Sequence, residues 1–207
     1  MPILISMDDS ELLPRKRCRE IFDAAQQAAR RAGVTEIEII LSSTDDSLTR
    51  FANNAIHQNV SERVSSASIR TQFDGRTARV STNRLHRDGI QAAVDGAIAL
   101  TKAAARSDEL LPFYEEGCDT AHSRFSQAGA ACTPDERAAG VREAIAVVEA
   151  AGQNAAGIFA TAQNVEALLN SGGVARYYFD TLTQFSITAM TEDSSGWAKA
   201  TSGSITE

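Results

Sequence analysis

The stretch that decides the fold runs from Leu48 to Asn83 and reads LTRFANNAIHQNVSERVSSASIRTQFDGRTARVSTN. Apolar and polar residues alternate along it with a period of two, which is typical of half-buried antiparallel strands. Asn53-Asn54 and Asp74-Gly75 interrupt the alternation with residues that favour tight turns. The stretch therefore predicts a short strand, a polar corner, a long strand, a tight turn and a return strand.

Within the long strand, the apolar residues change their parity. They are even-numbered up to Val64 and odd-numbered from Ala67 onwards. Successive side chains of a strand point to opposite faces, so such a change moves the apolar set to the other face unless the strand absorbs an extra residue. We therefore expect a bulge or bend near Ser65-Ser66. The same change recurs between Leu182 and Phe185.

This recurrence belongs to a longer internal repeat, with a shift of 118 or 119 residues. In the first copy, an apolar stripe predicts a helix from about Arg15 to Ala32, followed by a strand and the ribbon. In the second copy, Thr133 and Glu136 can form a capping box at the start of a helix that Gly152 ends, before another strand and ribbon. Any two antiparallel ribbons share their alternation, so coincidence is the alternative; the shared parity change favours duplication.

The fold class that follows is α+β, with duplicated helix–strand–antiparallel ribbon units whose helices pack on one face of antiparallel sheet. Residues 1–106 form a first unit with a covering helix, residues 107–132 a connector, and residues 133–207 a second unit. We expect the two units not to share one undivided sheet. The covering helix of the second unit would begin near position 206. This indicates a truncated second unit in an N-terminal piece of a longer protein; a complete protein with a frayed polar tail is the alternative.

Composition excludes several classes of protein. The formal charge of −7 argues against a nucleic-acid-binding surface, which is usually basic. No apolar run approaches the roughly 20 residues that cross a bilayer, and the first residues are not a secretory signal. The cysteines Cys18, Cys118 and Cys132 are odd in number and lack a CxxC spacing. We therefore expect a cytoplasmic protein with no disulfide framework and no membrane partner.

Few residues suggest chemistry within the chain. His57, His86 and His122 lie far apart in three predicted elements, so no metal site is expected in this segment. No GxSxG elbow or phosphate-binding glycine loop is present. Asp45-Asp46 is a pair of adjacent carboxylates, which we interpret as solvated loop charges because neighbours in sequence need not converge.

Hydrogen-bonding side chains gather around the polar corner. Arg50, Asn53, Asn54 and His57 are the candidate residues for binding a substrate there. The alternative is structural, since asparagine tolerates the left-handed backbone of a turn. No catalytic residue is assigned.

The chain resembles the N-terminal region of the TldD/PmbA family, also known as modulator of DNA gyrase. The resemblance rests on Arg50-Phe51-Ala52-Asn53-Asn54, Ile56-His57-Gln58-Asn59, Asp74-Gly75-Arg76, Ser81-Thr82-Asn83, Leu169-Asn170-Ser171 and Gly196-Trp197-Ala198. It implies an α+β N-terminal region in a protein of about twice this length, which associates as a homodimer or with a related subunit.

The resemblance also implies a zinc metallopeptidase that degrades or matures peptides. The family's metal motif is His-Glu-x-x-x-His with a later Cys, and no position of this sequence matches it. The segment is therefore expected to shape the substrate cavity and the dimer rather than to carry the metal. Whether the parent protein is itself an enzyme stays open. The alternatives are a non-enzymatic module that binds a peptide or partner, and a direct regulator of gyrase or DNA, which the acidic charge disfavours.

Overall fold

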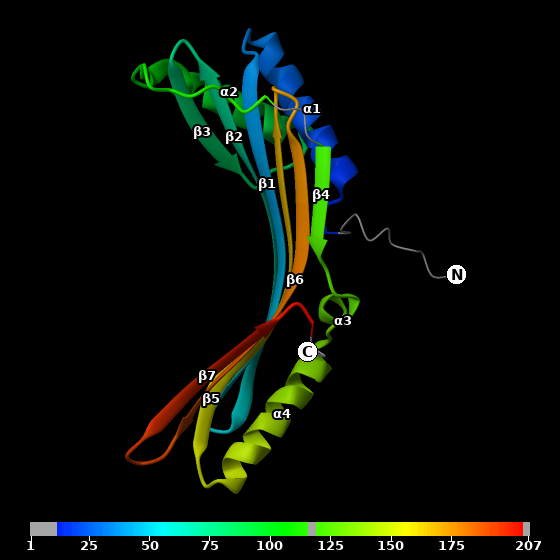
Figure 1. The fold of residues 1–207 in the computed structure, drawn as a ribbon, viewed down its shortest axis with the longest axis vertical. Coiled ribbons are helices and arrows are strands. Elements are labelled where there is room, and N and C mark those ends of the chain that lie inside the picture. Colours follow the sequence, from blue (N-terminus) through cyan, green and yellow to red (C-terminus); the bar gives the residue numbers. More distant parts are fainter. Residues whose placement is uncertain (1–11, 116–118, 205–207) are drawn as a thin grey trace, which may run out of the picture. The chain divides into compact units, whose positions relative to one another are not determined.

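The computed structural model of the chain describes residues 12–115 and 119–204 and is mixed α+β (Figure 1). Its helices are α1 (Arg15–Arg31), α2 (Arg87–Ala103), α3 (Gln127–Ala130) and α4 (Pro134–Ala150). Its strands are β1 (Glu36–Ala52), β2 (Ala55–Phe73), β3 (Arg76–Thr82), β4 (Asp119–Arg124), β5 (Asn154–Asn170), β6 (Ala175–Met190) and β7 (Ser195–Ser202). The predicted α+β fold class is confirmed.

The internal repeat is visible in the element bounds. A shift of 119 residues places α1 on α4, and a shift of 118 residues places β1 on β5, at both ends of each element. The two copies nevertheless share one seven-stranded sheet, in the order β3-β2-β1-β5-β6-β4, with β7 also paired to β6. The expectation that they would not share one sheet is therefore wrong. The long strands β1 and β5 pair with each other, which satisfies backbone groups that two separate ribbons would leave at exposed edges.

Two compact units divide this structure. Of the described residues, those within 1–43, 64–123 and 165–179 form unit 1, and those within 44–63, 124–164 and 180–207 form unit 2. Strands β1, β2, β5 and β6 each contribute a segment to both units. The compact units therefore cut across the predicted segments 1–106, 107–132 and 133–207, because each combines the helix of one repeat with strand segments of both.

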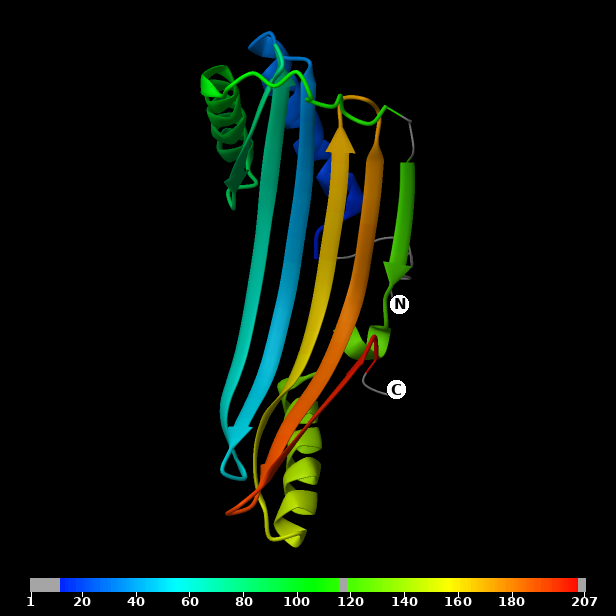
Figure 2. The ribbon, with the colours of Figure 1, turned by 60° about the vertical axis from the view of Figure 1, so that its left-hand side comes forward.

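In unit 1, α1 and α2 pack against each other and cover one face of the strands (Figure 2). Odd-numbered residues of β1, β2 and β5 point to this face and are buried: Ile37, Ile39, Leu41, Ala67, Ile69, Val165, Ala167 and Leu169. The apolar stripe of α1 packs among them, and Gly33 ends that helix in the predicted left-handed conformation, with φ of 78°.

In unit 2, α4 supplies the cover. Thr133 and Glu136 form the predicted capping box, and Gly152 follows the helix with φ of 67°. The central side chain is Phe51, which is 1% exposed and stacks on Phe185 with 6.0 Å between ring centroids. The buried residues packed with Phe51 are Val141, Ile145, Val148 and Ala155. Both predicted helix boundaries are therefore confirmed, because local capping chemistry determines them.

Of the bulge or bend expected near Ser65-Ser66, the bulge is absent from the described strands, and the bend stays a prediction. Side-chain partners on β1 and β2 keep one register along both strands, from Arg50–Gln58 through Asp45–Arg63 and Ser43–Ser65 to Glu38–Arg70. An inserted residue would shift that register by one. The parity change has a different cause: Val60 and Val64 are 37% and 48% exposed, on the face opposite the helices.

The turns and the connector complete the fold. Asn53, Asn54, Asp74 and Gly75 all have positive φ, as the two predicted tight turns require. Strand β3 pairs antiparallel with Ala67–Phe73 of β2. The predicted connector is more regular than expected, since β4 and α3 lie within it. Cys118 falls outside the described residues. No helix in the ranges 12–115 and 119–204 is long and apolar enough to cross a membrane.

Candidate functional site

Polar residues of the predicted corner form hydrogen bonds between β1 and β2. Arg50 donates a 3.2 Å hydrogen bond to Gln58, while Thr49, its neighbour in the strand, donates one of 2.6 Å to Asn59. Because successive side chains of β1 alternate, Arg50 and its partner Gln58 lie on one face of the sheet, and Thr49 and its partner Asn59 lie on the other. Among the four candidate residues, Arg50 is thus bonded within the β1–β2 ribbon, and a binding role for the four stays a prediction.

Asn54 already has a structural role. Its side-chain nitrogen donates to the carbonyl of Gln153 at 3.0 Å, and its side-chain oxygen accepts from the backbone N–H of buried Ala155 at 2.7 Å. Its own backbone N–H donates to the Ala155 carbonyl. Asn54 therefore ties the β1–β2 turn to the start of β5, whereas Asn53 and His57 are exposed.

Replacing Asn54 by alanine is expected to lower the free energy of unfolding by about 1–3 kcal/mol, because the buried N–H of Ala155 loses its acceptor. Asn54→Gly removes the side-chain hydrogen bonds but still adopts the positive φ without strain. It therefore separates the loss of these bonds from the backbone strain that alanine would add. His57→Ala should stay within about 0.5 kcal/mol of the parent. Urea unfolding of the three variants measures these free energies. Equal stability of Asn54→Ala and His57→Ala would show that the bonds from Asn54 to the start of β5 do not stabilise the protein.

An open strand edge lies beside the corner. Strand β3 pairs with β2 only from Ala67 onwards, and β2 has no other described neighbour on that side. Residues 55–63 of β2, in unit 2, therefore present unpaired backbone N–H and C=O groups. Nearly all their side chains are exposed, and Glu62 and Arg63 are charged. Charged residues on an edge oppose uncontrolled strand pairing, yet leave the backbone able to accept an extended peptide.

The face opposite the helices carries a hollow in unit 2, with a volume of about 320 Å³. Strand β5 lies between β1 and β6, and its residues here are the small Ala160 and Ala162. The neighbouring strands β1 and β6 carry larger side chains, so the hollow forms above Ala160 and Ala162. Its other lining residues are Asp46, Ser47, Leu48, Val60, Thr161, Glu62, Leu182 and Gln184.

The hollow was not predicted from the sequence. Asp45-Asp46 was assigned to a loop, but both residues belong to β1, and this interpretation is wrong. The even-numbered apolar residues Val60 and Leu182 line the hollow, and they are the feature of the sequence that could have indicated it. The alternation does not say which face of the strands the helices cover, because that depends on tertiary packing.

The histidines and cysteines do not form a metal centre. His57 is on β2, His122 is on β4, and His86 caps α2 by accepting a hydrogen bond from the Gly89 N–H at 3.3 Å. Across the described residues, no group of three or more His, Cys, Asp or Glu side chains is arranged to hold a metal ion. The resemblance implies zinc ligands in the remainder of the parent protein, so zinc stays a proposal for that protein.

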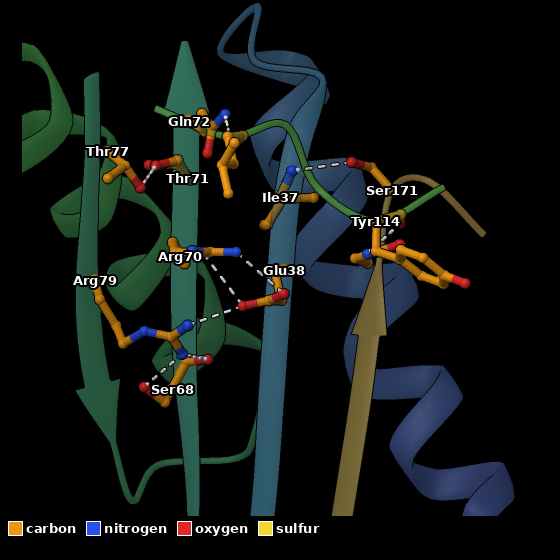
Figure 3. A network of polar contacts seen from close by, with 12 residues as sticks. Ile37, Glu38, Ser68, Arg70, Thr71, Gln72, Thr77, Arg79, Tyr114 and Ser171 are labelled. Carbon is orange, nitrogen blue, oxygen red and sulfur yellow. Dashed lines mark hydrogen bonds and ion pairs between the residues drawn. The ribbon is translucent and has the colours of Figure 1, made fainter. Parts of the chain in front are cut away.

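A second polar cluster, in unit 1, is structural. Glu38 is 8% exposed and accepts from the guanidinium groups of Arg79 at 2.8 Å and Arg70 at 3.3 Å (Figure 3). The Arg70 guanidinium also lies 4.4 Å from the ring centre of Phe113, and Gln72 donates to the carbonyl of Leu111. These contacts hold the connector against β2, and they leave the carboxylate of Glu38 already paired.

Comparison with known proteins gives one family match. Residues 37–101 match PmbA/TldA metallopeptidase domain 1, which contains the β1–β3 ribbon and most of α2. No curated protein sequence matches the chain. The resemblance to the N-terminal region of this family, inferred from the corner and ribbon residues, is confirmed.

Solved structures share the fold. A protein named as a modulator of DNA gyrase from Bacteroides thetaiotaomicron VPI-5482 has a TM-score of 0.76 and 17% identity, covering 91% of this chain and 46% of its own. A protein named as a modulator of a DNA gyrase from Thermotoga maritima MSB8 has a TM-score of 0.75 and 15% identity, covering 92% of this chain and 44% of its own. TldE from Thermococcus kodakarensis has a TM-score of 0.71 and 14% identity, covering 89% of this chain and 42% of its own. This chain therefore spans a little under half the length of each.

Proposed function

We propose, because this chain carries domain 1 of the PmbA/TldA metallopeptidases, that it is the N-terminal part of a subunit of a peptide-degrading or peptide-maturing enzyme. Its role is to shape the substrate cavity and to support the dimer. The observation that carries this proposal is the family match over residues 37–101, joined to a fold shared over about nine-tenths of the chain with longer relatives. The metal ligands are assigned to the remainder of the parent protein.

The open edge of β2 is the surface that the chain offers to a peptide. An extended peptide can add to residues 55–63 as a further strand, with affinity that comes from main-chain hydrogen bonds. Such binding tolerates many sequences, as a degrading or maturing enzyme needs. Arg50 on β1 and His57 on β2 belong to the corner end of this ribbon, and their proposed role is to contact side chains of the bound peptide. Asn53 lies at the tip of the same corner.

The test uses the full-length protein with its partner subunit. His57→Ala and Arg50→Ala should each lower kcat/KM for peptide cleavage by roughly fivefold, since each removes about one hydrogen bond to the substrate. Zinc content, measured by elemental analysis, should not change. His122→Ala, an exposed histidine in unit 1, is the matched control. Unaltered cleavage in both corner variants would refute the role of the edge.

The partner and the setting belong to the same proposal. The structural likeness to TldE supports a related TldD/TldE-type subunit as the partner, with a homodimer as the other arrangement. The cytoplasm is the proposed location, and zinc is the proposed cofactor of the parent enzyme.

A second candidate is a non-enzymatic module that binds a peptide or partner. The open edge supports it equally, because strand addition requires no metal. The sequence of the parent gene beyond Glu207 distinguishes the two: His-Glu-x-x-x-His with a distal Cys supports the peptidase. If a full-length parent lacks the motif and its complex with any related subunit cleaves no peptide, the module is the better account.

A further inference from the structure

Two carboxylates face each other at the hollow in unit 2. Hydrogen bonds from Ser47 to Ser61 and from Arg63 to Asp45 fix the register of β1 and β2 on either side. Asp46 therefore lies directly opposite Glu62, on the face that carries the hollow. Side chains in such positions have Cβ atoms about 4.5–5.5 Å apart, and like charges there repel.

The opposite face provides the contrast. There the neighbouring residue Asp45 pairs with Arg63, so charge on that face is balanced. Among the ion pairs of the described residues, none involves Asp46 or Glu62. Burial raises the pKa of Asp46, and the negative charges of Asp45 and Glu62 raise it further. The hollow thus has an acidic side that the chain itself leaves unbalanced.

Apolar groups line the rest of the hollow. Leu48 lies directly opposite Val60 in the same register, two residues along each strand from the carboxylates. With Ala160, Ala162 and Leu182 they form an apolar surface next to the acidic pair. Val60 and Leu182 are 37% and 41% exposed, so this surface stays open to solvent.

The spacing of these groups indicates the kind of partner. Residues i and i+2 of an extended strand lie about 6.6–7 Å apart on one side. The distance from the acidic pair to the apolar pair along β1 and β2 is the same, because it also spans two residues. We propose that the hollow is a docking site for an extended peptide segment that carries a lysine or arginine two residues away from an aliphatic residue.

This inference deepens the proposed function and rests on it for the presence of a peptide. The basic side chain lies between Asp46 and Glu62, where it replaces their repulsion by attraction. The aliphatic side chain fills the space above Ala160 and Ala162 and removes apolar surface from water. This segment lies on the face of the sheet above β1, β2 and β5, apart from the β2 edge, so its preference for basic and aliphatic residues is separate from main-chain pairing at that edge.

The experiment measures binding by fluorescence anisotropy with the full-length protein. The probe is a dye-labelled octapeptide of alternating serine with lysine and leucine in turn, so that each lysine is two residues from a leucine. The wild-type protein should bind it saturably, and a peptide with glutamate in place of lysine should not bind. Asp46→Asn combined with Glu62→Gln should weaken binding about tenfold, since two charge pairs are lost.

A matched variant controls for net charge. Asp45→Asn alters the adjacent residue by the same charge but on the opposite face, and binding should stay within about twofold of the wild type. Ala162→Leu fills the hollow without changing charge and should weaken binding by a similar factor to the double variant. Thermal unfolding of each variant confirms that it is folded.

Four results would overturn the docking site: no saturable binding, full binding in the double variant, equal loss in Asp45→Asn, or displacement by calcium chloride alone at matched ionic strength. Cleavage assays run in parallel separate the two proposals. Peptide binding without cleavage by the complete complex would refute the peptidase role and keep the docking site. Cleavage of peptides by the complete complex with no preference for lysine would refute the docking site and keep the peptidase role.

Discussion

Phe51→Ala is expected to lower the free energy of unfolding by about 3–5 kcal/mol, which is the usual cost of truncating a buried phenylalanine. The ring of Phe51 is 1% exposed and stacks on Phe185. It also lies so close to Gly157 that a Cβ there would be 2.7 Å from its ring. A close-packed surround of this kind relaxes poorly around a cavity, which places the loss in the upper part of the range.

Val147→Ala is the control for this change. Val147 is 72% exposed on α4, in the same unit, so its truncation should alter stability by less than about 0.5 kcal/mol. Urea unfolding of both variants, followed by tryptophan fluorescence and circular dichroism, makes the comparison. A loss below about 1 kcal/mol for Phe51→Ala would mean that α4 does not depend on this ring for its packing.

Glu38→Gln is expected to destabilise the protein by about 1–3 kcal/mol, because it leaves the guanidinium groups of Arg70 and Arg79 without their shared carboxylate. The arginine side chains are 32% and 35% exposed, so water compensates for part of the loss. This places the effect below the 3–5 kcal/mol typical of a fully buried ion pair.

Glu20→Gln is the matched control for Glu38. It breaks an ion pair with Arg17 whose side chains are 47% and 48% exposed, and such surface pairs contribute little. Differential scanning calorimetry should therefore show a clear fall in Tm for Glu38→Gln and almost none for Glu20→Gln. Equal Tm values for the two variants would show that the Glu38 cluster does not stabilise the connector.

The features predicted correctly from sequence are those with local causes. The cap at Thr133 depends on Glu136 three residues later, and both positive-φ turns depend on asparagine, aspartate or glycine at the turn itself. The polar corner was also located correctly, but its candidate binding residues were not shown to converge. Arg50 and Asn54 make hydrogen bonds to Gln58 of β2, to Gln153 and to Ala155 of β5, and these partners depend on strand pairing rather than on the local sequence.

The incorrect predictions concern features that are determined by residues far apart in the sequence. Arg137 was absent from the predicted apolar stripe of α4, yet it is 2% exposed and donates hydrogen bonds to Cys132 and Thr161. The carbonyl of Cys132 is in the loop before the helix, but Thr161 is on β5. No pattern within the helix distinguishes this arginine from an exposed one.

Sequence patterns alone identify the three long helices, the long strands, the turns, the internal repeat and the resemblance to a peptidase family whose metal motif the chain lacks, but not β4 and α3. Only the tertiary structure decided that β1 pairs with β5 in one sheet, which face the helices cover, and that Asp46 lies opposite Glu62. The physical reason is range. Caps and turns are stabilised by contacts within a few residues, whereas strand pairing and the exposed face depend on more distant segments: β1 and β5 are offset by 118 residues, and Asp46 and Glu62 are 16 residues apart.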